Sequence, residues 1–294
     1  MRQGNLLQVN KWVALKGGHT NEIFKVKHKE DYVVLRTSKR PLKELEYEFN
    51  LHKYLCENGL LTPSPILFDN NHKVGTINFK NTEKNAIMLS FIDGRYPNLF
   101  SKSDLTRVGQ ALALLHMVKP PHFAKSGSGA SLNRIKNNYS CIDFLQKYVS
   151  FDIKFLVEEL SKDIINTELA LCHGDLFWNN TLINEVGLYL LDLEGMGVDY
   201  KILDLAKMIY GFVTPRNTHI NLSSAYSILE GYNHIFKVDS KKLDLIKKAI
   251  CISGVQISIW RYNYYRLNPF TDIKKDSWIE SMKAAENWLN IELF

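Results

Sequence analysis

The stretch "CHGDLFWNN", residues 172–180, decides the fold, because it places a histidine, an aspartate and two asparagines at the edge of the core. It begins at the end of the apolar run "LALC", residues 169–172, and the apolar run "TLI", residues 181–183, comes directly after it. Binding and catalytic residues are often carried on loops that a rigid scaffold positions. A capped turn is the alternative interpretation, because an aspartate before a turn commonly accepts backbone hydrogen bonds.

The residues downstream favour a functional site over a capped turn. Asp175 and Asn180 are followed by a short strand-like run, a turn and the segment "LLDLEG", which supplies Asp192 and Glu194. This order matches the pattern H-x-D-x-x-x-x-N with a later metal-binding aspartate, which serves phosphoryl transfer. Such transfer needs a carboxylate to orient and deprotonate the attacking hydroxyl, and oxygen ligands for magnesium. We therefore expect Asp175 to be the base and Asn180 and Asp192 to hold Mg²⁺.

Glu194 and His173 complete this set. Glu194 follows Asp192 by two residues at the expected strand end, and side chains two apart in a strand point to the same side. We therefore expect Glu194 to contribute to a second metal. A histidine beside a candidate base also has hydrogen-bonding uses, so we expect His173 to brace the loop and assign it no proton transfer.

The first third of the chain is rich in β-strand signals. Two β-rich runs, around Ile23 to Val26 and Tyr32 to Arg36, are joined by the charged turn "KHKED" and predict a hairpin. Residues 42–58 have apolar side chains at roughly helical spacing and end before Gly59, so we expect a helix there. The run "NAIMLSFI", residues 85–92, predicts a buried strand.

Beyond residue 92 the pattern becomes mainly helical. "SDLTRVGQALALLHMV", residues 103–118, has helical periodicity and offers Ser103 as a candidate N-cap. Most of the remaining chain is helical too, apart from one hairpin predicted within residues 181–194. The sequence therefore predicts an α+β protein with a β-rich N-terminal lobe, residues 1–92, and a mainly helical C-terminal lobe, residues 93–294.

Composition excludes several classes of protein. The formal charge is +6, with 14 basic and 9 acidic residues through Ile92 against 23 and 22 afterwards. A mildly basic first lobe suits an anionic ligand such as a nucleotide but lacks the dense basic stripe of a nucleic-acid binder. The four scattered cysteines include no C-x-x-C pair, which indicates neither a disulfide framework nor a zinc site. We expect no membrane span, no secretion signal and a cytoplasmic location.

The chain resembles the aminoglycoside phosphotransferase and choline kinase superfamily, and within it the choline/ethanolamine kinase branch. Besides residues 172–180, three stretches carry the likeness. "LKGGHTNEIFKV" resembles the glycine turn of that branch, "LLDLEGMGVDYKILDLA" resembles its metal-binding segment, and "VVLRTS" with "ELEYEFNLHKYLCENGL" resembles its basic strand and partner helix. The resemblance implies a two-lobed protein-kinase-like fold with ATP as phosphate donor and Mg²⁺ as cofactor.

The resemblance also implies which residues of the first lobe bind ATP. Glycines would let the backbone turn tightly above the phosphates, a strand arginine would pair with phosphate oxygens, and hinge backbone groups would bond the adenine edge. Glu48 is expected to orient that arginine; Glu46 competes in sequence but lies about 200° away around the helix. The expected ATP-binding residues are Gly17, Gly18, Thr20, Asn21, Arg36, Glu48, Leu89, Ser90 and Phe91.

The acceptor site is less defined by the sequence. Choline kinases hold a quaternary ammonium among aromatic side chains, and a late helix here supplies aromatics in the corresponding region. Where choline kinases usually continue after Asp204 with an Asn-His pair and an acidic residue, this chain reads "LAKMIYGF" with Gly211 near the expected acid. The candidate acceptor-binding residues are Phe177, Trp178, Trp260, Tyr264 and Trp278.

The sequence therefore predicts a kinase that transfers the γ-phosphate of ATP to a hydroxyl of a small metabolite, such as choline, ethanolamine, thiamine or a related amino alcohol. The alternatives are an antibiotic-modifying aminoglycoside kinase, a homoserine-type kinase of the same fold, and a catalytically silent nucleotide-binding module. Silent modules usually lose the base or a metal ligand, whereas Asp175, Asn180 and Asp192 are all present. No A-P-E segment follows Asp192, which disfavours a protein kinase.

Overall fold

The computed structural model describes residues 12–15, 21–69, 71–79, 82–214, 220–268 and 276–292. The chain divides into two compact units. The first comprises Met1–Tyr96 and Thr181–Glu194, and the second comprises Pro97–Asn180 and Gly195–Phe294. Strands dominate the first unit and helices the second, so the predicted α+β class is confirmed.

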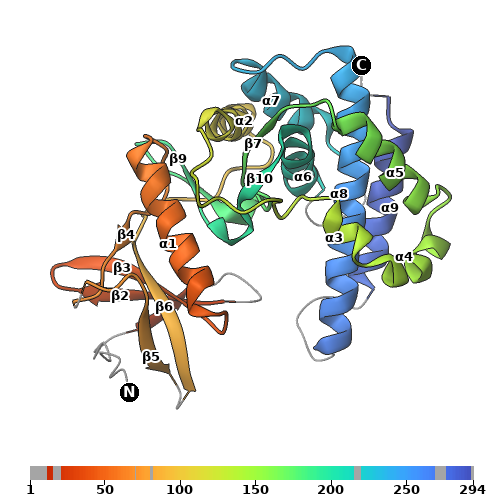
Figure 1. The fold of residues 1–294 in the computed structure, drawn as a ribbon. Coiled ribbons are helices and arrows are strands. Elements are labelled where there is room, and N and C mark those ends of the chain that lie inside the picture. The colour runs from red at the N-terminus through yellow and green to blue at the C-terminus, as the bar shows by residue number, and fades with distance from the viewer. Residues whose placement is uncertain are drawn as a thin grey trace. The chain divides into compact units, whose positions relative to one another are not determined.

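The first unit is built on a six-stranded antiparallel sheet (Figure 1). The strand order is β1-β2-β3-β6-β4, and β5 pairs with β6. The predicted hairpin is present as β2 and β3, and the predicted helix as α1. The elements are β1 (Trp12–Leu15), β2 (Glu22–His28), β3 (Asp31–Ser38), α1 (Leu42–Glu57), β4 (Pro65–Ile66), β5 (Gly75–Phe79), β6 (Thr82–Ser90) and the small hairpin β8 (Thr181–Ile183) and β9 (Leu188–Leu190).

The sheet has an apolar core on each face, because alternate side chains of a strand point to opposite sides. On β3, Val33 and Leu35 join one core, whose other buried members are Phe24, Val26, Phe68, Ile77, Ala86 and Met88. On the other face, α1 packs Leu45 and Phe49 against Ile87 and Leu89 of β6, with Val34 of β3 beside them. Since Arg36 follows Val34 by two residues, strand geometry aims its side chain at the α1 face.

The second unit is a helical assembly with one two-stranded sheet, in which β7 and β10 pair antiparallel. The longest of its described helices, α8, runs beside α9 (Figure 1). Its main elements are α2 (Lys102–Met117), α3 (Asn133–Lys136), α4 (Tyr139–Leu145), α5 (Ile153–Ile164), β7 (Leu169–Cys172), β10 (Gly197–Tyr200), α6 (Lys201–Val213), α7 (Leu222–Asn233), α8 (Ser240–Leu267) and α9 (Ser277–Asn290), with 3₁₀ turns η1 (Gln146–Tyr148), η2 (Trp178–Asn180) and η3 (Leu193–Gly195), the last of which extends from the first unit.

The start of α2 differs from the sequence prediction. Ser103 lies inside the helix, and the N-cap is Ser101, whose hydroxyl accepts a hydrogen bond from the Asp104 N–H at 3.3 Å. Both serines stand before the same apolar periodicity, so spacing alone does not separate them. The preceding turn does, because it presents Ser101 in an extended conformation at the position where an N-cap bonds the N3 amide.

None of the helices in the described ranges is long and apolar enough to cross a membrane.

Candidate active site

The loop after β7 makes a tight turn at Gly174, which packs against the backbone of two further glycines. Gly174 has a φ of +78°, in the left-handed region, and a Cβ there would lie 2.3 Å from the Gly129 nitrogen and 2.5 Å from the Gly195 oxygen. Only glycine fits this close backbone contact. The Gly129 N–H also donates to the Gly195 oxygen at 2.8 Å. The turn thus directs the chain out of the buried strand and exposes Asp175.

Asp204, on the first turn of α6, holds this loop in place through hydrogen bonds. Its carboxylate is 1% exposed and accepts the backbone N–H groups of His173 and Gly174, both at 2.7 Å. It also bonds His116 Nε2 at 3.1 Å, and His116 Nδ1 bonds the Tyr232 hydroxyl at 2.8 Å. Burial acts to raise the pKa of Asp204, but the hydrogen bond and charge of His116 and the loop N–H groups outweigh it and lower that pKa.

His116, Cys172 and Asp204 form a buried group with metal-ligand atoms within 4.8 Å of one another. Hydrogen bonds account for this clustering. Both nitrogens of His116 are engaged, and the Cys172 Sγ donates to the Asp199 oxygen at 3.3 Å. Burial raises the pKa of the Cys172 thiol well above its ordinary value, which keeps it protonated and a poor metal ligand. The group is therefore a structural brace.

Asp175 presents a partly exposed carboxylate within this braced loop, with 42% of its side chain exposed. The Asp175 N–H donates to His173 Nδ1 at 3.3 Å, so the expected bracing hydrogen bond of His173 is confirmed. Asn180, at the end of η2, donates its side-chain N–H to the Asp175 backbone oxygen at 2.8 Å. Lys207 of α6 places its Nζ 3.3 Å from Asp175 Oδ1. Backbone and carboxylate of Asp175 are thus fixed by different partners.

Of the candidate acceptor residues, Phe177 lies against α6. A Cβ at Gly211 would come within 1.7 Å of the Phe177 ring, so the ring packs directly on that glycine. The Lys207 Nζ lies 5.9 Å from the centre of the same ring. Trp178 is partly buried in η2. Phe177 therefore shares its surroundings with Asp175 through Lys207.

The other candidate aromatics belong to the packing of α8 and α9. Trp260 stacks on Tyr264 with ring centres 5.2 Å apart, and Trp260 is 42% exposed. Trp278 is 6% exposed and lies among aromatic rings from α4, η1 and α8, with centre distances of 5.5, 4.8 and 5.4 Å to Phe144, Tyr148 and Tyr262. The pair on α8 thus offers an exposed ring, whereas Trp278 is covered by neighbouring aromatics.

In the first unit, Asp192 and Glu194 converge on one arginine. Arg36 Nη2 lies 2.6 Å from Asp192 Oδ1 and 2.7 Å from Glu194 Oε2. The sequence predicted that a strand end would align these two carboxylates, but β9 ends at Leu190 and Asp192 has a φ of +56°. A left-handed residue followed by the 3₁₀ turn η3 performs the alignment instead.

Arg36 is further held by α1. Its Nη1 pairs with Glu48, which is 0% exposed, while Glu46 is exposed on the other side of the helix. Arg40 adds a second guanidinium, with its Nη2 2.8 Å from Glu48 Oε2 and 3.0 Å from Glu194 Oε2. We name Arg36, Arg40, Glu48, Asp192 and Glu194 the arginine–carboxylate cluster.

The remaining candidate ATP-binding residues divide into described and undescribed positions. Gly17, Gly18 and Thr20 lie outside the described residues. Asn21 donates from its side chain to Glu194 Oε2 at 3.0 Å, which adds a neutral donor to the arginine–carboxylate cluster. At the expected hinge, the Ser90 N–H donates to the Ser64 oxygen at 2.8 Å and the Phe91 N–H to the Tyr32 oxygen at 3.4 Å, while Leu89 is buried.

Several residues of the site were not assigned a role from the sequence. Lys207 and Asp204 had a detectable signal, because both are charged residues inside the otherwise apolar helix "ILDLAKMIYGFV". Arg40 had none beyond its closeness to β3, since a basic residue between a strand and a helix is common. The partnership of His116 with Asp204 depends on the packing of α2 against α7 and β7, which no local pattern encodes.

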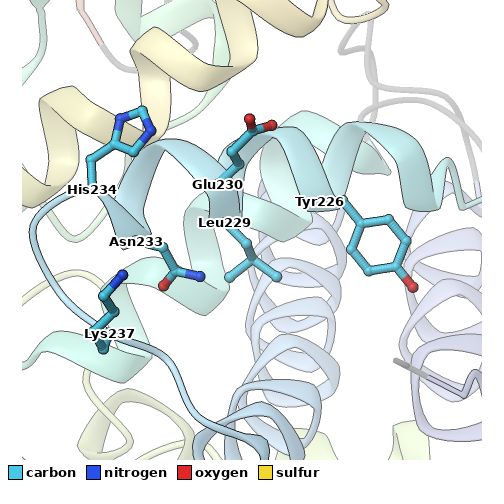
Figure 2. A pocket seen from close by; sticks show the side chains of 6 residues that line it. All are labelled: Tyr226, Leu229, Glu230, Asn233, His234 and Lys237. Carbon is cyan, nitrogen blue, oxygen red and sulfur yellow. The ribbon is translucent and has the colours of Figure 1, made fainter.

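A separate hollow of about 420 Å³ lies along α7. Figure 2 shows its lining side chains, which are Tyr226, Leu229, Glu230, Asn233, His234 and Lys237. Two of its polar side chains have partners: Glu230 pairs with Lys102 at 2.9 Å, and His234 Nδ1 bonds Gln110 at 2.7 Å. None of the residues predicted to act in phosphoryl transfer lines this hollow.

Comparison with known families places the chain in a class. The model of the phosphotransferase enzyme family matches residues 11–232, which is more than half of the chain. The chain therefore belongs to the phosphotransferase enzyme family, and the superfamily expected from the sequence is confirmed.

Individual relatives are more distant. The chain is similar to a homoserine kinase of Nitrobacter hamburgensis, at 22% identity over 208 residues, covering 69% of this chain and 63% of that protein. The chain spans between 54 and 63% of the length of the curated homoserine kinases it matches.

Solved structures share the fold. An amicoumacin kinase in complex with AMP-PNP, Ca²⁺ and Ami superposes with a TM-score of 0.71 at 15% identity, covering 97% of this chain and 90% of that one. A microcompartment-associated aminopropanol kinase has a TM-score of 0.69 at 13% identity, covering 97% and 92%. At these identities the likeness establishes the fold.

Proposed function

We propose that this protein transfers the γ-phosphoryl group of ATP to a hydroxyl of a small metabolite. The main support for the proposal is the position of the Asp175 carboxylate. Its carboxylate is partly exposed on a loop whose backbone is fixed by Asp204 and Asn180, in a chain of the phosphotransferase enzyme family. A fixed carboxylate with access to solvent is what orienting and deprotonating an attacking hydroxyl requires.

The arginine–carboxylate cluster supports the donor side of the proposal. Two guanidiniums lie beside Asp192 and Glu194, and guanidinium groups bind phosphate oxygens while carboxylates hold magnesium. Bound Mg²⁺ would neutralise charge on the phosphates. The chemistry of these side chains suits Mg²⁺. Both carboxylates are 30% exposed, and Asn180 uses only its side-chain N–H to bond Asp175, so its side-chain oxygen is left for a cation. We propose Asp192, Glu194 and Asn180 as the magnesium ligands.

The acceptor is proposed at the level of a small alcohol. Choline, ethanolamine, thiamine and related amino alcohols remain candidates from the sequence, and the similarity to homoserine kinases adds an amino acid alcohol. An antibiotic acceptor is the second candidate function, supported by the fold shared with the amicoumacin kinase. A silent nucleotide-binding module is disfavoured, because Asp175, Asn180 and Asp192 are all retained.

An ADP-release assay tests the proposal. The purified protein with Mg²⁺ and ATP would be offered amino alcohols, homoserine, thiamine, sugars and aminoglycosides, each against a no-acceptor blank. The proposal predicts acceptor-dependent ADP release, and a loss of about 10²-fold or more in Asp175→Asn. The matched control is Asp143→Asn, an exposed aspartate on α4 paired with Lys154. Full acceptor-dependent turnover in Asp175→Asn would contradict the assignment.

A further inference from the structure

Lys207 is a buried lysine beside the proposed base. It extends from α6 with 7% of its side chain exposed, and its Nζ lies 3.3 Å from Asp175 Oδ1. The same Nζ donates to the Gly129 backbone oxygen at 2.8 Å. Lysine is rarely buried this deeply unless it is paired. The pairing partner here is the carboxylate proposed to receive the acceptor hydroxyl.

The hydrogen-bonding capacity of Lys207 exceeds these two partners. An ammonium group has three N–H donors and accepts none. Within the described ranges, Asp175 and Gly129 are its two oxygen partners. The third donor is therefore available to an oxygen of a molecule bound at Asp175. A buried donor gains most from an anionic oxygen, because charge-assisted hydrogen bonds are about twice as strong as neutral ones.

The charges around Lys207 favour the same kind of ligand. Arg134 of α3 is exposed and close enough to act on Lys207 electrostatically. The carboxylates that act on Lys207 are Asp175 and Asp204, and Asp204 is already committed to His116 and two backbone N–H groups. Beside Lys207 the two cationic side chains, Lys207 and Arg134, therefore outnumber the one uncommitted carboxylate, Asp175, so an anionic group of the acceptor is favoured there over a cationic one.

We propose that Lys207 determines acceptor specificity by binding a carboxylate of the acceptor, so that the preferred substrate is a hydroxy acid whose carboxylate lies a few bonds from the hydroxyl oriented by Asp175. This inference rests on the proposed phosphotransferase function and narrows its acceptor class. The ammonium also positions Asp175, because one carboxylate oxygen is held by Lys207 while the other is left for the hydroxyl.

A matched set of alcohols tests the inference. L-homoserine carries an amine and a carboxylate, 4-hydroxybutyrate carries only the carboxylate, and 3-amino-1-propanol carries only the amine. Choline adds a permanent cation. The measurement is kcat/KM for each alcohol, by ADP release, in the wild type, Lys207→Met and Lys207→Arg. The ratio between two acceptors cancels any effect on Asp175 that is common to both.

The inference predicts that the wild type prefers 4-hydroxybutyrate and L-homoserine over 3-amino-1-propanol by about tenfold or more. Lys207→Met should remove this preference mainly through KM, and Lys207→Arg should keep it because the charge remains. Circular dichroism and thermal melting establish that each variant is folded.

Three outcomes would overturn the inference. The preference is absent in the wild type, or it survives in folded Lys207→Met, or only alcohols outside this set are phosphorylated. In each of those cases the phosphotransferase function stands. If no alcohol of any class raises ADP release above the blank, the proposed function itself fails. The two failures are therefore distinguishable.

Discussion

At the scale of single residues, Arg36 organises the first unit's polar cluster. One guanidinium contacts Glu48, Asp192 and Glu194, and its side chain is 7% exposed. Three carboxylates around one cation would repel one another without a second positive group, and Arg40 provides it. The desolvation cost of burying such charges is offset only when every member keeps its partners. Removing one member should therefore affect both stability and phosphate binding.

Glu48→Gln tests this dependence. The change leaves Arg36 and Arg40 without one charged acceptor, so we expect a loss of about 1.5–3 kcal/mol in the free energy of unfolding. The KM for ATP should rise because Arg36 is no longer oriented. The matched control is Glu46→Gln on the exposed side of the same helix, which should change stability by less than about 0.5 kcal/mol. Urea unfolding and ATP kinetics measure both, and equal effects of the two variants would contradict the account.

At the scale of elements, α6 carries the support of the proposed base. Its inner face presents Asp204 to the loop backbone, Lys207 to the Asp175 carboxylate and Gly211 to the Phe177 ring. These residues are spaced three and four apart, so they lie along one face of the helix. One helix therefore sets the position of the loop at three points. Substitutions along this face should change catalysis, although none of these three residues is proposed to contact ATP.

Asp204→Asn should weaken the hydrogen bonds between α6 and the loop backbone. An amide cannot accept all three hydrogen bonds that the carboxylate accepts, so we expect a loss of about 3 kcal/mol in stability and a lower kcat. The pKa of Asp204 is lowered from its ordinary value of 3.8, so its stabilising effect is complete above that value. It is lost as the pH falls through the lower folded-state pKa.

Thermal melting from pH 6 to about pH 2 measures this effect. The wild type should lose more stability in acid than Asp204→Asn, because the variant has no carboxylate to protonate at this position. Asp143→Asn, on the exposed surface of α4, is the control and should match the wild type. An Asp204→Asn protein as stable as the wild type at pH 6 would refute the bracing role.

Gly211→Ala should disturb the contact between α6 and the Phe177 ring. Alanine favours a helix over glycine by about 1 kcal/mol, but its Cβ would overlap the Phe177 ring. The ring must move, and it is attached two residues from Asp175, so we expect kcat/KM to fall about tenfold while the melting temperature changes little. Adding Phe177→Leu should restore part of the activity by relieving the overlap. A double variant no better than Gly211→Ala would contradict this explanation.

The sequence predicted the elements of the site better than their connections. The β2–β3 hairpin, α1 and the Glu48 side of α1 follow from local periodicity, which depends only on neighbouring residues. The turn at Asp192 and the N-cap of α2 were predicted differently, because each depends on backbone conformations that several residues satisfy equally. The links from Lys207 to Asp175 and from His116 to Asp204 join residues 32 and 88 positions apart, and local patterns carry no information about them.

At the scale of the whole molecule, each unit carries one part of the proposed machinery. The first unit holds the arginine–carboxylate cluster, and the second holds Asp175 on its braced loop. The second unit also buries an ammonium group, and burial lowers the pKa of Lys207 despite the opposing charges of Asp175 and Asp204. Because the folded state disfavours the charged form of this lysine, keeping Lys207 charged lowers the free energy of unfolding.

Lys207→Met should therefore be at least as stable as the wild type near neutral pH. Below the lowered pKa the lysine is charged in both states, so its destabilising effect is complete there. Between that pKa and the ordinary value of 10.5, the unfolded chain binds more protons, and the effect fades as the pH rises. The difference in unfolding free energy between the two proteins should thus shrink from pH 7 towards pH 10. A Lys207→Met protein markedly less stable at pH 7 would show that the lysine is structural.

We propose that Asp175 directs phosphoryl transfer to a hydroxyl of the acceptor. Phosphorus-31 NMR of a reaction with ATP, Mg²⁺ and an accepted alcohol tests it most directly, because a phosphate monoester of the acceptor has its own resonance. With the wild-type protein this resonance should grow in step with ADP, and Asp175→Asn should slow its growth by about 10²-fold or more. Growth at the wild-type rate in Asp175→Asn, or ADP formed with inorganic phosphate and no monoester, would contradict it.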